Sequence, residues 1–497
     1  MKLATSLLVI PAVGLLLASC KGPIAGTIAA SDKCYKPSGN SNPVSSVVFC
    51  ADPTAVEYDG RLYVYGTNDH QQYLNAANNT YEKIKSLVCF STEDMVNWTY
   101  HGIINTEKIA PWIINSWAPS IVSRQEEDGL THFYLYFSNN GCGVGVITST
   151  DPLGPWSDPL GRPLIHQGQP EIGDCPNPFD PGVCIDGNGV GWLAFGGGTA
   201  KDGNDEMPGS TRIARLNGDM VSLAQTASIP APYFFEASEL NFINGKYVYT
   251  LNNNWIPRNP DTWKYQGIPM PSRCSMAYMV TDTPLDPESW EYKGHYFLNP
   301  GDSGMEDSNN HTHIHKYKGE YYILSHSQLL LENSHLKGGF RSLMADKLDV
   351  DEDNLVFGLT GGTRKGVEQT EPFDPSRKTS GTTMCSSADI RFINEEDPSE
   401  ICSEAIADGA WIMIRNVDFS RIRQFRPEFG ISFSSATGSG GVEVRLDAPD
   451  GETIAALAYR YGKDKPVSRK TMNPGDGCHD VYILLSSEGM RLKSWSF

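Results

Sequence analysis

One local pattern occurs five times between residues 51 and 324, and it constrains the fold more than any other feature of the sequence. Each copy has a polar residue, a short β-run, a turn ending in glycine, and a second β-run rich in aromatic residues. The turn dipeptides are Asp59-Gly60, Asp128-Gly129, Asn188-Gly189, Asn244-Gly245 and Lys318-Gly319. Asp-Gly and Asn-Gly are strong signals for a tight hairpin because both turn positions need a positive φ. We therefore predict five β-hairpins.

The spacing of these turns predicts the architecture. The turn glycines lie 56 to 74 residues apart, which leaves room for one four-stranded sheet in each repeat. Radial repetition of small sheets leaves only short, protected edges. We therefore expect an all-β protein with a five-bladed β-propeller over residues 47–360. Two sandwiches or one long jelly roll would not repeat in this way.

Charge and composition limit the class of partner. The chain has 59 acidic and 40 basic residues and a formal charge of −19, so it would repel a polyanion. We expect no nucleic-acid partner, because such partners are held by neutralising phosphates. The counts of 48 Gly and 32 Pro suit a turn-rich all-β protein. Abundant aromatic residues and only 20% charged residues fit a protein that reads neutral carbohydrate.

The N-terminus has the form of an export signal. Lys2 precedes a short, mostly apolar stretch over residues 3–17, and small residues lead into Cys20. The run Leu17-Ala18-Ser19-Cys20 resembles a bacterial lipobox, in which the cysteine is acylated after cleavage. We predict a lipoprotein signal peptide over 1–19, lipidation at Cys20 and a tether over 20–46.

This reading also predicts where the protein lies. The residue after Cys20 is Lys21 and not Asp, so we expect an exported outer-membrane or cell-surface lipoprotein, with the periplasm as an alternative. No later stretch is long enough for a transmembrane helix, so the lipid anchor would be the only membrane contact.

Ten cysteines follow Cys20. In an exported protein they could form disulfides, or they could be buried as thiols. They contain no Cys-x-x-Cys pair, which argues against a zinc site. The sequence assigns no pairing.

Polar residues that open the repeats are the candidate catalytic groups. In a propeller the first strand of each blade lines the central channel, so Asp52, Asp180, Glu236 and His311 should meet at one mouth. Carboxylates crowded together raise one another's pKa. One carboxyl kept protonated beside one kept ionised is what acid and base catalysis of acetal cleavage requires.

The repeat openings resemble the motifs of glycoside hydrolase family 43, in order and over about 310 residues. The matching segments are Ala51-Asp52-Pro53, Trp117-Ala118-Pro119-Ser120-Ile121, Phe179-Asp180-Pro181-Gly182-Val183, Phe234-Phe235-Glu236-Ala237-Ser238 and Asn309-Asn310-His311. The resemblance implies an inverting enzyme that removes arabinofuranosyl or xylosyl units from plant polysaccharides. It implies Asp52 as general base, Glu236 as general acid, and Asp180 as the carboxylate that tunes the pKa of the acid and orients it.

Two other acidic residues lie near these motifs. Glu239 is the competitor for the acid, but strand alternation puts it on the opposite face from Glu236, and the register of the repeats favours Glu236. Asp186 lies in the turn that ends at Gly189, and we expect a structural role for it.

The residues His311, His313 and His315 alternate onto one strand face, where they resemble a row of metal ligands. The family resemblance instead implies that His311 lies near the channel axis, as a sugar-site residue or beside a calcium or sodium ion. Hard cations prefer oxygen ligands, so we expect no zinc chemistry and structural roles for the other two. No cofactor is required by this reading; calcium in the channel would be structural.

Three further residues are candidates for substrate binding. Arg341 matches a family arginine that hydrogen-bonds the bound sugar; a surface salt bridge is the alternative. Trp117 and Phe235 are candidates for the wall of the sugar pocket, with core packing as an equal alternative.

The last part of the chain is a separate unit. Residues 367–497 contain alternating β-runs that fit a β-sandwich of the jelly-roll type. They resemble a family 6 carbohydrate-binding module, except that Arg377 and the following residues stand where that family has a Glu-Ala-Glu run that supplies calcium ligands. The unit is thus expected either to bind sugar or to act as a buttress against the propeller.

These observations predict an inverting glycoside hydrolase that releases L-arabinofuranose from the side chains of arabinoxylan or arabinan. The expected partner is plant cell-wall polysaccharide, and the expected state is a monomer. A β-xylosidase acting on xylo-oligosaccharides is the alternative within the same chemistry, and the sequence does not settle whether an endo-arabinanase groove is present. A non-catalytic surface glycan-binding lipoprotein is the alternative of another class.

Overall fold

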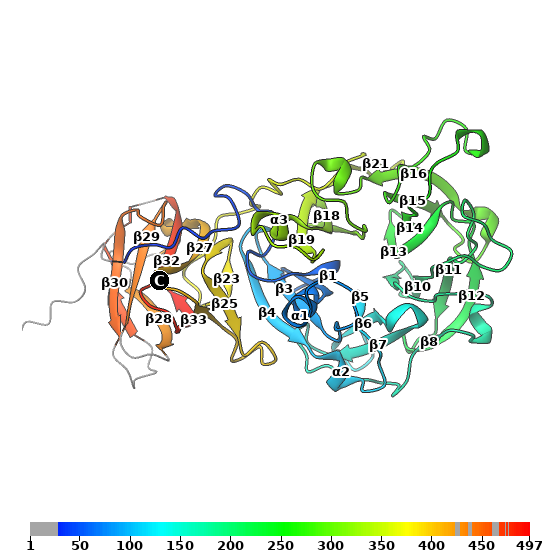
Figure 1. Cartoon of the computed structure of the whole chain (residues 1–497). Helices are drawn as coiled ribbons and strands as arrows, with labels where there is room; N and C mark the ends of the chain where they lie inside the picture. Colours follow the sequence, from blue (N-terminus) through cyan, green and yellow to red (C-terminus); the bar gives the residue numbers. More distant parts are fainter. Residues whose placement is uncertain (1–27, 423–427, 436–439, 460–466, 473, 476) are drawn as a thin grey trace, which may run out of the picture.

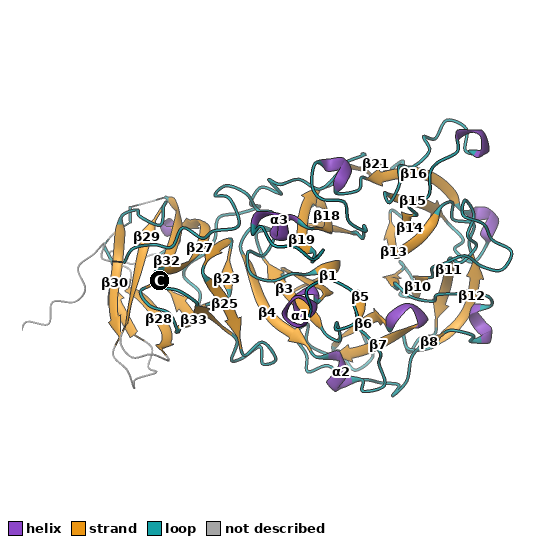
Figure 2. Ribbon diagram, in the orientation of Figure 1, coloured by secondary structure: helices purple, strands orange, loops and turns teal. Residues whose placement is uncertain are grey.

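The computed structural model describes residues 28–422, 428–435, 440–459, 467–472, 474–475 and 477–497. The predicted signal peptide and lipidation site at Cys20 lie outside these residues. The described chain is almost entirely strand and loop (Figure 2). Its short helices are α1 (Asp69–Asn75), α2 (Thr106–Ile109) and α3 (Leu329–Asn333), with six 3₁₀ turns at Asn140–Cys142, Pro170–Ile172, Pro260–Thr262, Pro287–Ser289, Gly301–Ser303 and Phe419–Arg421. The expected all-β class is confirmed.

Five antiparallel sheets follow one another along the first 350 residues. The first sheet has β1 (Ala51–Tyr58), β2 (Arg61–Thr67), β3 (Leu87–Thr92) and β4 (Trp98–Ile104). The second has β5 (Trp117–Gln125), β6 (Thr131–Ser138), β7 (Gly143–Ser149) and β8 (Ile165–His166). The third has β9 (Gly182–Ile185), β10 (Gly191–Phe195), β11 (Arg212–Leu216) and β12 (Leu223–Ser228). The fourth has β13 (Phe234–Ile243), β14 (Lys246–Asn253), β15 (Met276–Thr281) and β16 (Glu291–Phe297). The fifth has β17 (His313–Tyr317), β18 (Glu320–Ser327) and β19 (Ser342–Lys347), followed by a two-stranded ribbon of β20 (Val350–Asp351) and β21 (Val356–Phe357).

The repeated turns form the hairpins that open the sheets. In the β1–β2 hairpin, Tyr58 pairs with Arg61, and the two residues between them have φ of 51° and 73°. Both values are positive, as the tight hairpin turn requires. The turns after Ile243 and after Tyr317 are built in the same way, whereas the second and third hairpins have longer loops.

The five sheets are arranged around a common centre (Figure 1), and the first strands of successive sheets are neighbours. Each sheet packs its two faces against the sheets before and after it. In β6, Phe133, Leu135 and Phe137 belong to the core shared with the first sheet. The alternate residues Tyr134 and Tyr136 belong to the core shared with the third sheet. This explains the uninterrupted aromatic runs, because a strand buried on both faces has no polar side.

The segment before β1 is packed and is not a free tether over residues 28–46. The fifth sheet has only three strands, and Val44 lies along the outer one, where its N–H donates to the Leu343 carbonyl at 2.8 Å. At the other end, the Trp411 indole donates to the Ser31 carbonyl at 2.8 Å. The segment thus joins the fifth sheet to the C-terminal unit. Its polar composition concealed this, because the partners that hold it to the fifth sheet and to the C-terminal unit lie more than 290 residues away in the sequence.

The C-terminal unit has two antiparallel sheets. One contains β25 (Ile390–Ile393), β26 (Cys402–Ala405), β33 (Met490–Ser496), β28 (Glu428–Ser435) and β31 (Val467–Lys470), with β22 (Thr379–Ser380) paired to β33. The other contains β24 (Ser386–Ala388), β27 (Ala410–Asp418), β32 (Cys478–Leu485), β29 (Gly440–Leu446) and β30 (Thr453–Tyr459). Apolar residues of both sheets share one core.

That core continues into the first sheet. The short strand β23 (Thr383–Met384) pairs with β4, and the rings of Tyr100 and Phe392 stack with centroids 4.7 Å apart. The two units therefore share an apolar interface.

The cysteine question left open by the sequence has a clear outcome within the described residues. All ten cysteines from Cys34 to Cys478 are free, and seven of them are buried. No helix in the described ranges is both long and apolar enough to cross a membrane.

Candidate active site

The first strands of four sheets begin in the same unusual backbone conformation. Asp52, Ala118, Asp180 and Ala237 have φ of 48°, 36°, 50° and 57°. The left-handed region costs about 1–2 kcal/mol for a residue other than glycine. Pairing is irregular at the same place in β1, β5 and β13. Such irregularities re-aim side chains and are common next to active sites.

Hydrogen bonds between sheets hold these four residues. The N–H of Ala118 donates to the Thr67 hydroxyl at 2.7 Å, and that hydroxyl donates to Asp52 Oδ2 at 2.7 Å. The N–H of Ala237 donates to Asp180 Oδ2 at 2.8 Å. Asp52 and Asp180 are thus bonded across sheet boundaries, which restricts their positions.

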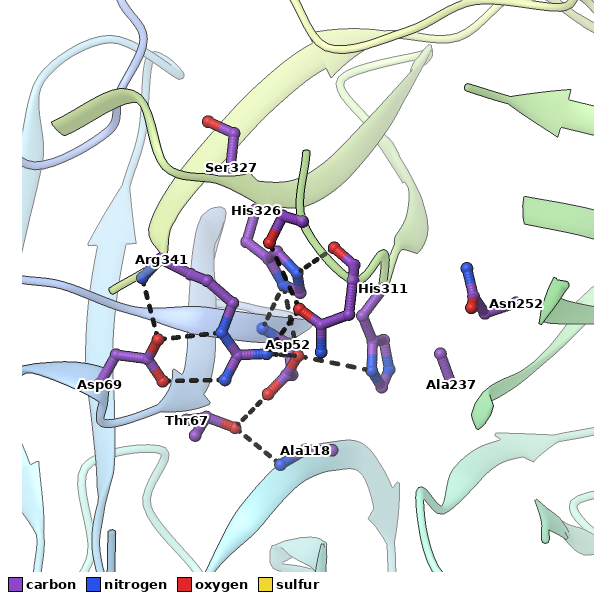
Figure 3. A network of polar contacts seen from close by, with 12 residues as sticks. Asp52, Thr67, Asp69, Ala118, Ala237, Asn252, His311, His326, Ser327 and Arg341 are labelled. Atoms are coloured by element: carbon purple, nitrogen blue, oxygen red, sulfur yellow. Dashed lines mark hydrogen bonds and ion pairs between the residues drawn. The ribbon is translucent and has the colours of Figure 1, made fainter. Parts of the chain in front are cut away.

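Asp52 is buried and bonded to a buried arginine (Figure 3). Arg341 Nη1 donates to Asp52 Oδ1 at 2.8 Å, and His311 Nδ1 lies 3.8 Å from the same oxygen. Burial alone would raise the pKa of Asp52, but the Arg341 guanidinium, followed by His326, His311 and the Thr67 hydroxyl, outweighs it and lowers the pKa to about 2. Asp52 is therefore ionised at neutral pH.

Asp69, which is not among the predicted site residues, holds this arginine. It is fully buried at the start of α1, and its two carboxylate oxygens accept from Arg341 Nε and Nη2, both at 2.9 Å. This bidentate pair orients the guanidinium toward Asp52. No sequence signal marks Asp69, because its partner is 272 residues away.

His326 supports Asp52 as a neutral ring. Its Nδ1 accepts the Asp52 backbone N–H at 3.0 Å, and its Nε2 donates to the Asn309 carbonyl at 2.9 Å. Burial, with Arg341 nearby, lowers the pKa of His326 to about 3. Arg341 is therefore the permanent positive charge beside Asp52.

Glu236 has the opposite protonation state. It is partly exposed and crowded by protein atoms, and its desolvation, together with the charges of Asp180 and Asp52, raises its pKa to about 8. Asp180 is buried and also has a raised pKa, first through burial and then through Asp52. Asp180 and Glu236 titrate as a coupled pair. The structure thus brings the three predicted carboxyl groups together.

Comparisons with known proteins show the family to which the chain belongs. The sequence profile of "Glycosyl hydrolases family 43" matches residues 40–356. An arabinoxylan arabinofuranohydrolase of Bacillus subtilis is 32% identical over 95% of this chain and 94% of its own length. One from Paenibacillus polymyxa is 30% identical over 96% of this chain and 77% of its own length. The chain belongs to glycosyl hydrolase family 43.

The likeness extends to the three-dimensional structure. The crystal structure of a family 43 arabinoxylan arabinofuranohydrolase from Bacillus subtilis, in complex with cellotetraose, has a TM-score of 0.84 with this protein. It is 30% identical, and the match covers 94% of this chain and 99% of that one. The C-terminal unit is therefore included in the likeness to this family 43 relative.

Within the family 43 site, Glu239 and Asp186 have other partners. Glu239 lies deeper in β13 and is fully buried, which raises its pKa well above the usual range. Its Oε1 lies 2.8 Å from His313 Nδ1 in a hydrogen bond, and His313 Nε2 is hydrogen-bonded to His315 Nδ1 at 3.3 Å. Asp186 accepts hydrogen bonds from two aromatic side chains of neighbouring strands.

The donor set near His311 does not fit a directly bound metal. Within the described ranges, no group of three or more His, Cys, Asp or Glu side chains could hold an ion. His311 Nε2 is buried, and no group in the part of the chain that the structure describes bonds it. A single imidazole nitrogen is a poor ligand for a hard cation, which takes six to eight oxygens in the case of calcium.

The remaining predicted residues are placed as follows. Arg341 is buried, not on the surface, and its bonds to Asp52 and Asp69 are its main contacts. Trp117 is half-buried, and its indole donates to the Tyr81 carbonyl at 3.1 Å. Phe235 is half-buried beside Glu236, within the irregular part of β13.

Proposed function

We propose that this protein is an inverting glycoside hydrolase that releases L-arabinofuranose from arabinoxylan. The observation that carries the proposal is the opposite protonation of two carboxyl groups in one site. Asp52 is held ionised by Arg341, whereas the pKa of Glu236 is raised to about 8. A base and an acid are therefore both ready at neutral pH. The arabinofuranohydrolase names of two relatives matched over nearly the whole chain support the choice of sugar and polymer.

In the proposed reaction Asp52 removes a proton from a water molecule whose oxygen attacks the anomeric carbon. The bond from that carbon to the glycosidic oxygen breaks, and Glu236 gives its proton to the leaving oxygen. An inverting site needs about 6.5–9.5 Å between the two carboxyl groups so that the water fits. Asp180 raises the pKa of Glu236 and, by accepting the N–H of Ala237, fixes the backbone beside it.

For substrate binding we propose His311, Arg341, Trp117 and Phe235. The Arg341 guanidinium donates four hydrogen bonds, which Asp69, Asp52 and Asn309 accept. It therefore has few donors left for a sugar. His311 Nε2 is buried and has no partner in the described chain, which makes it the better candidate for a sugar hydroxyl or a water molecule. A calcium or sodium ion near the channel axis would have to be held through water.

For the architecture we propose that the five sheets are the blades of a five-bladed β-propeller over residues 47–360. We propose a β-sandwich over 367–497, similar to a carbohydrate-binding module. The shared core with the first sheet supports the buttress role. Export as a monomeric lipoprotein anchored at Cys20 remains a proposal that rests on the sequence alone.

The test is hydrolysis by purified protein of nitrophenyl arabinofuranoside, nitrophenyl xyloside and arabinoxylan, with product anomers followed by proton NMR. We expect arabinose from the first and third substrates, released as the inverted anomer. Release of xylose instead would favour the β-xylosidase alternative, and a retained anomer would exclude the inverting mechanism.

The matched variant is Glu236→Gln, which keeps the size of the side chain and removes the proton. It should lower kcat on arabinoxylan by about 10²–10⁴, the usual contribution of a general acid. An unchanged rate would show that Glu236 is not the general acid, whereas no hydrolysis by the unmodified protein would support the non-catalytic glycan-binding alternative.

A further inference from the structure

We infer that Tyr81 is a substrate-binding residue of this site, with its phenol hydroxyl bonded to the sugar and its ring forming a wall together with Trp117. The inference deepens the proposed function and rests on it for the identity of the sugar. Neither the repeat motifs nor the family resemblance points to this residue.

Tyr81 is in contact with the centre of the site. Its ring lies over the Arg341 guanidinium, with 5.0 Å from the guanidinium carbon to the ring centroid. It meets the ring of Trp117 edge to face, with centroids 6.2 Å apart and an angle of 68°. Tyr81 therefore contacts both Arg341, which is bonded to Asp52, and Trp117, which is a predicted wall of the sugar pocket.

The backbone of Tyr81 is strained and firmly held. Its φ is 65°, in the left-handed region that a bulky residue rarely adopts. Its carbonyl accepts from the Trp117 indole at 3.1 Å and from Asn115 Nδ2 at 3.3 Å. Strain of this kind persists where the surrounding structure imposes it and clusters at functional sites. The position of the tyrosine is thus set before any substrate binds.

The phenol hydroxyl is available. Tyr81 is half-buried, and in the described part of the chain its hydroxyl makes no hydrogen bond. The Arg341 guanidinium lowers the pKa of the phenol, but burial and the charges of Asp69, Asp52 and Glu236 outweigh it and raise that pKa. The hydroxyl therefore remains a donor, close to the reacting carboxyl groups and free to bond a sugar oxygen.

The alternative is that Tyr81 only packs against Arg341. The two roles differ in what the hydroxyl does, because packing needs the ring alone. Tyr81→Phe keeps the ring and removes the hydroxyl, so it separates them. The matched control is Tyr73→Phe, since the ring of Tyr73 packs on the rings of Phe49 and Phe340.

Two measurements test the inference. The first is kcat and KM of the Tyr81→Phe variant on nitrophenyl arabinofuranoside. The second is calorimetric binding of an arabinofuranosyl-substituted xylo-oligosaccharide, with Tyr81→Phe placed on the Glu236→Gln background. We expect KM to rise and affinity to fall by about three- to tenfold, the value of one hydrogen bond, with kcat within about twofold. The control should match its parent in both.

Changes below twofold in both measurements would overturn the inference, as would a loss of kcat with unchanged binding. Tyr81→Leu removes the ring as well and should weaken binding further; if it unfolds, Tyr81→Phe alone decides. Failure of the proposed function looks different, because the unmodified protein would then release no arabinose. The binding comparison can still be made in that case.

Discussion

Asp52 and Glu236 show how one site gives two carboxyl groups opposite protonation states. Both are desolvated, which alone would raise both pKa values. Arg341 reverses the effect for Asp52, whereas Asp180 adds to it for Glu236. The sequence predicted both residues from the positions where the repeats begin. It could not predict Asp69 or His326, whose partners are distant in the sequence and carry no motif.

The role of Arg341 predicts a pH effect. Arg341→Lys keeps the charge, but a lysine lacks the planar guanidinium that donates to Asp52 and Asp69 at the same time. The pKa of Asp52 should then rise toward its ordinary value. Because the proposed base must be ionised, the acidic limb of the pH profile should move to higher pH. The measurement is kcat/KM against pH, with Arg364→Lys, which alters an ion pair with Glu332 outside the site, as control. An unshifted acidic limb would contradict this role.

Asp180 should control the basic limb. Asp180→Asn removes the nearby negative charge while keeping an oxygen for the N–H of Ala237. The pKa of Glu236 should fall from about 8, so the protonated acid and the activity should be lost at a lower pH. The control is Asp186→Asn, since Asp186 bonds Trp192 and Tyr247 instead. If both variants keep the basic limb of the unmodified protein, Asp180 does not tune the acid.

At the scale of the elements, the inner strands approach one another very closely. A Cβ added at Gly182, the first residue of β9, would lie 2.3 Å from the Glu239 Cα in β13. Only glycine permits this contact between the third and fourth sheets. The sequence marked Gly182 within a family motif, but the reason for glycine appears only when the two strands are seen together.

Gly182→Ala should therefore destabilise the protein by about 1–3 kcal/mol, the usual cost of overpacking. Thermal unfolding followed by circular dichroism measures this, and kcat/KM should fall as well because Asp180 lies two residues away. Gly218→Ala is the control, since a Cβ there meets nothing within 4 Å. Equal melting temperatures for the two variants would show that β9 and β13 can move apart without loss of stability.

At the scale of the whole molecule, the C-terminal unit is joined to the first sheet by strand pairing and by one continuous core. The segment around Val44 and Ser31 adds a second connection. The unit therefore packs against the sheet that carries Asp52.

Removal of residues 367–497 should expose Trp98 and Tyr100, both now buried, and lead to aggregation or a lower melting temperature. Size-exclusion chromatography and thermal unfolding provide the measurement. The control is a chain that begins at residue 28, which keeps every contact described above. A monomeric truncated protein with full activity would refute the buttress role.

The sequence by itself determined the hairpins, the count of repeats and the three carboxyl groups. These depend on signals within a few residues: turn dipeptides that need positive φ, strands with period 2, and motifs that open the strand before each turn. Only the tertiary structure decided the ionisation of Asp52, the role of Asp69, the packing of residues 28–46 and the place of Tyr81. Each of these depends on contacts between segments far apart in the chain, 289 residues for Arg341 with Asp52. Burial and charge act through space, and no local pattern records which distant groups will meet.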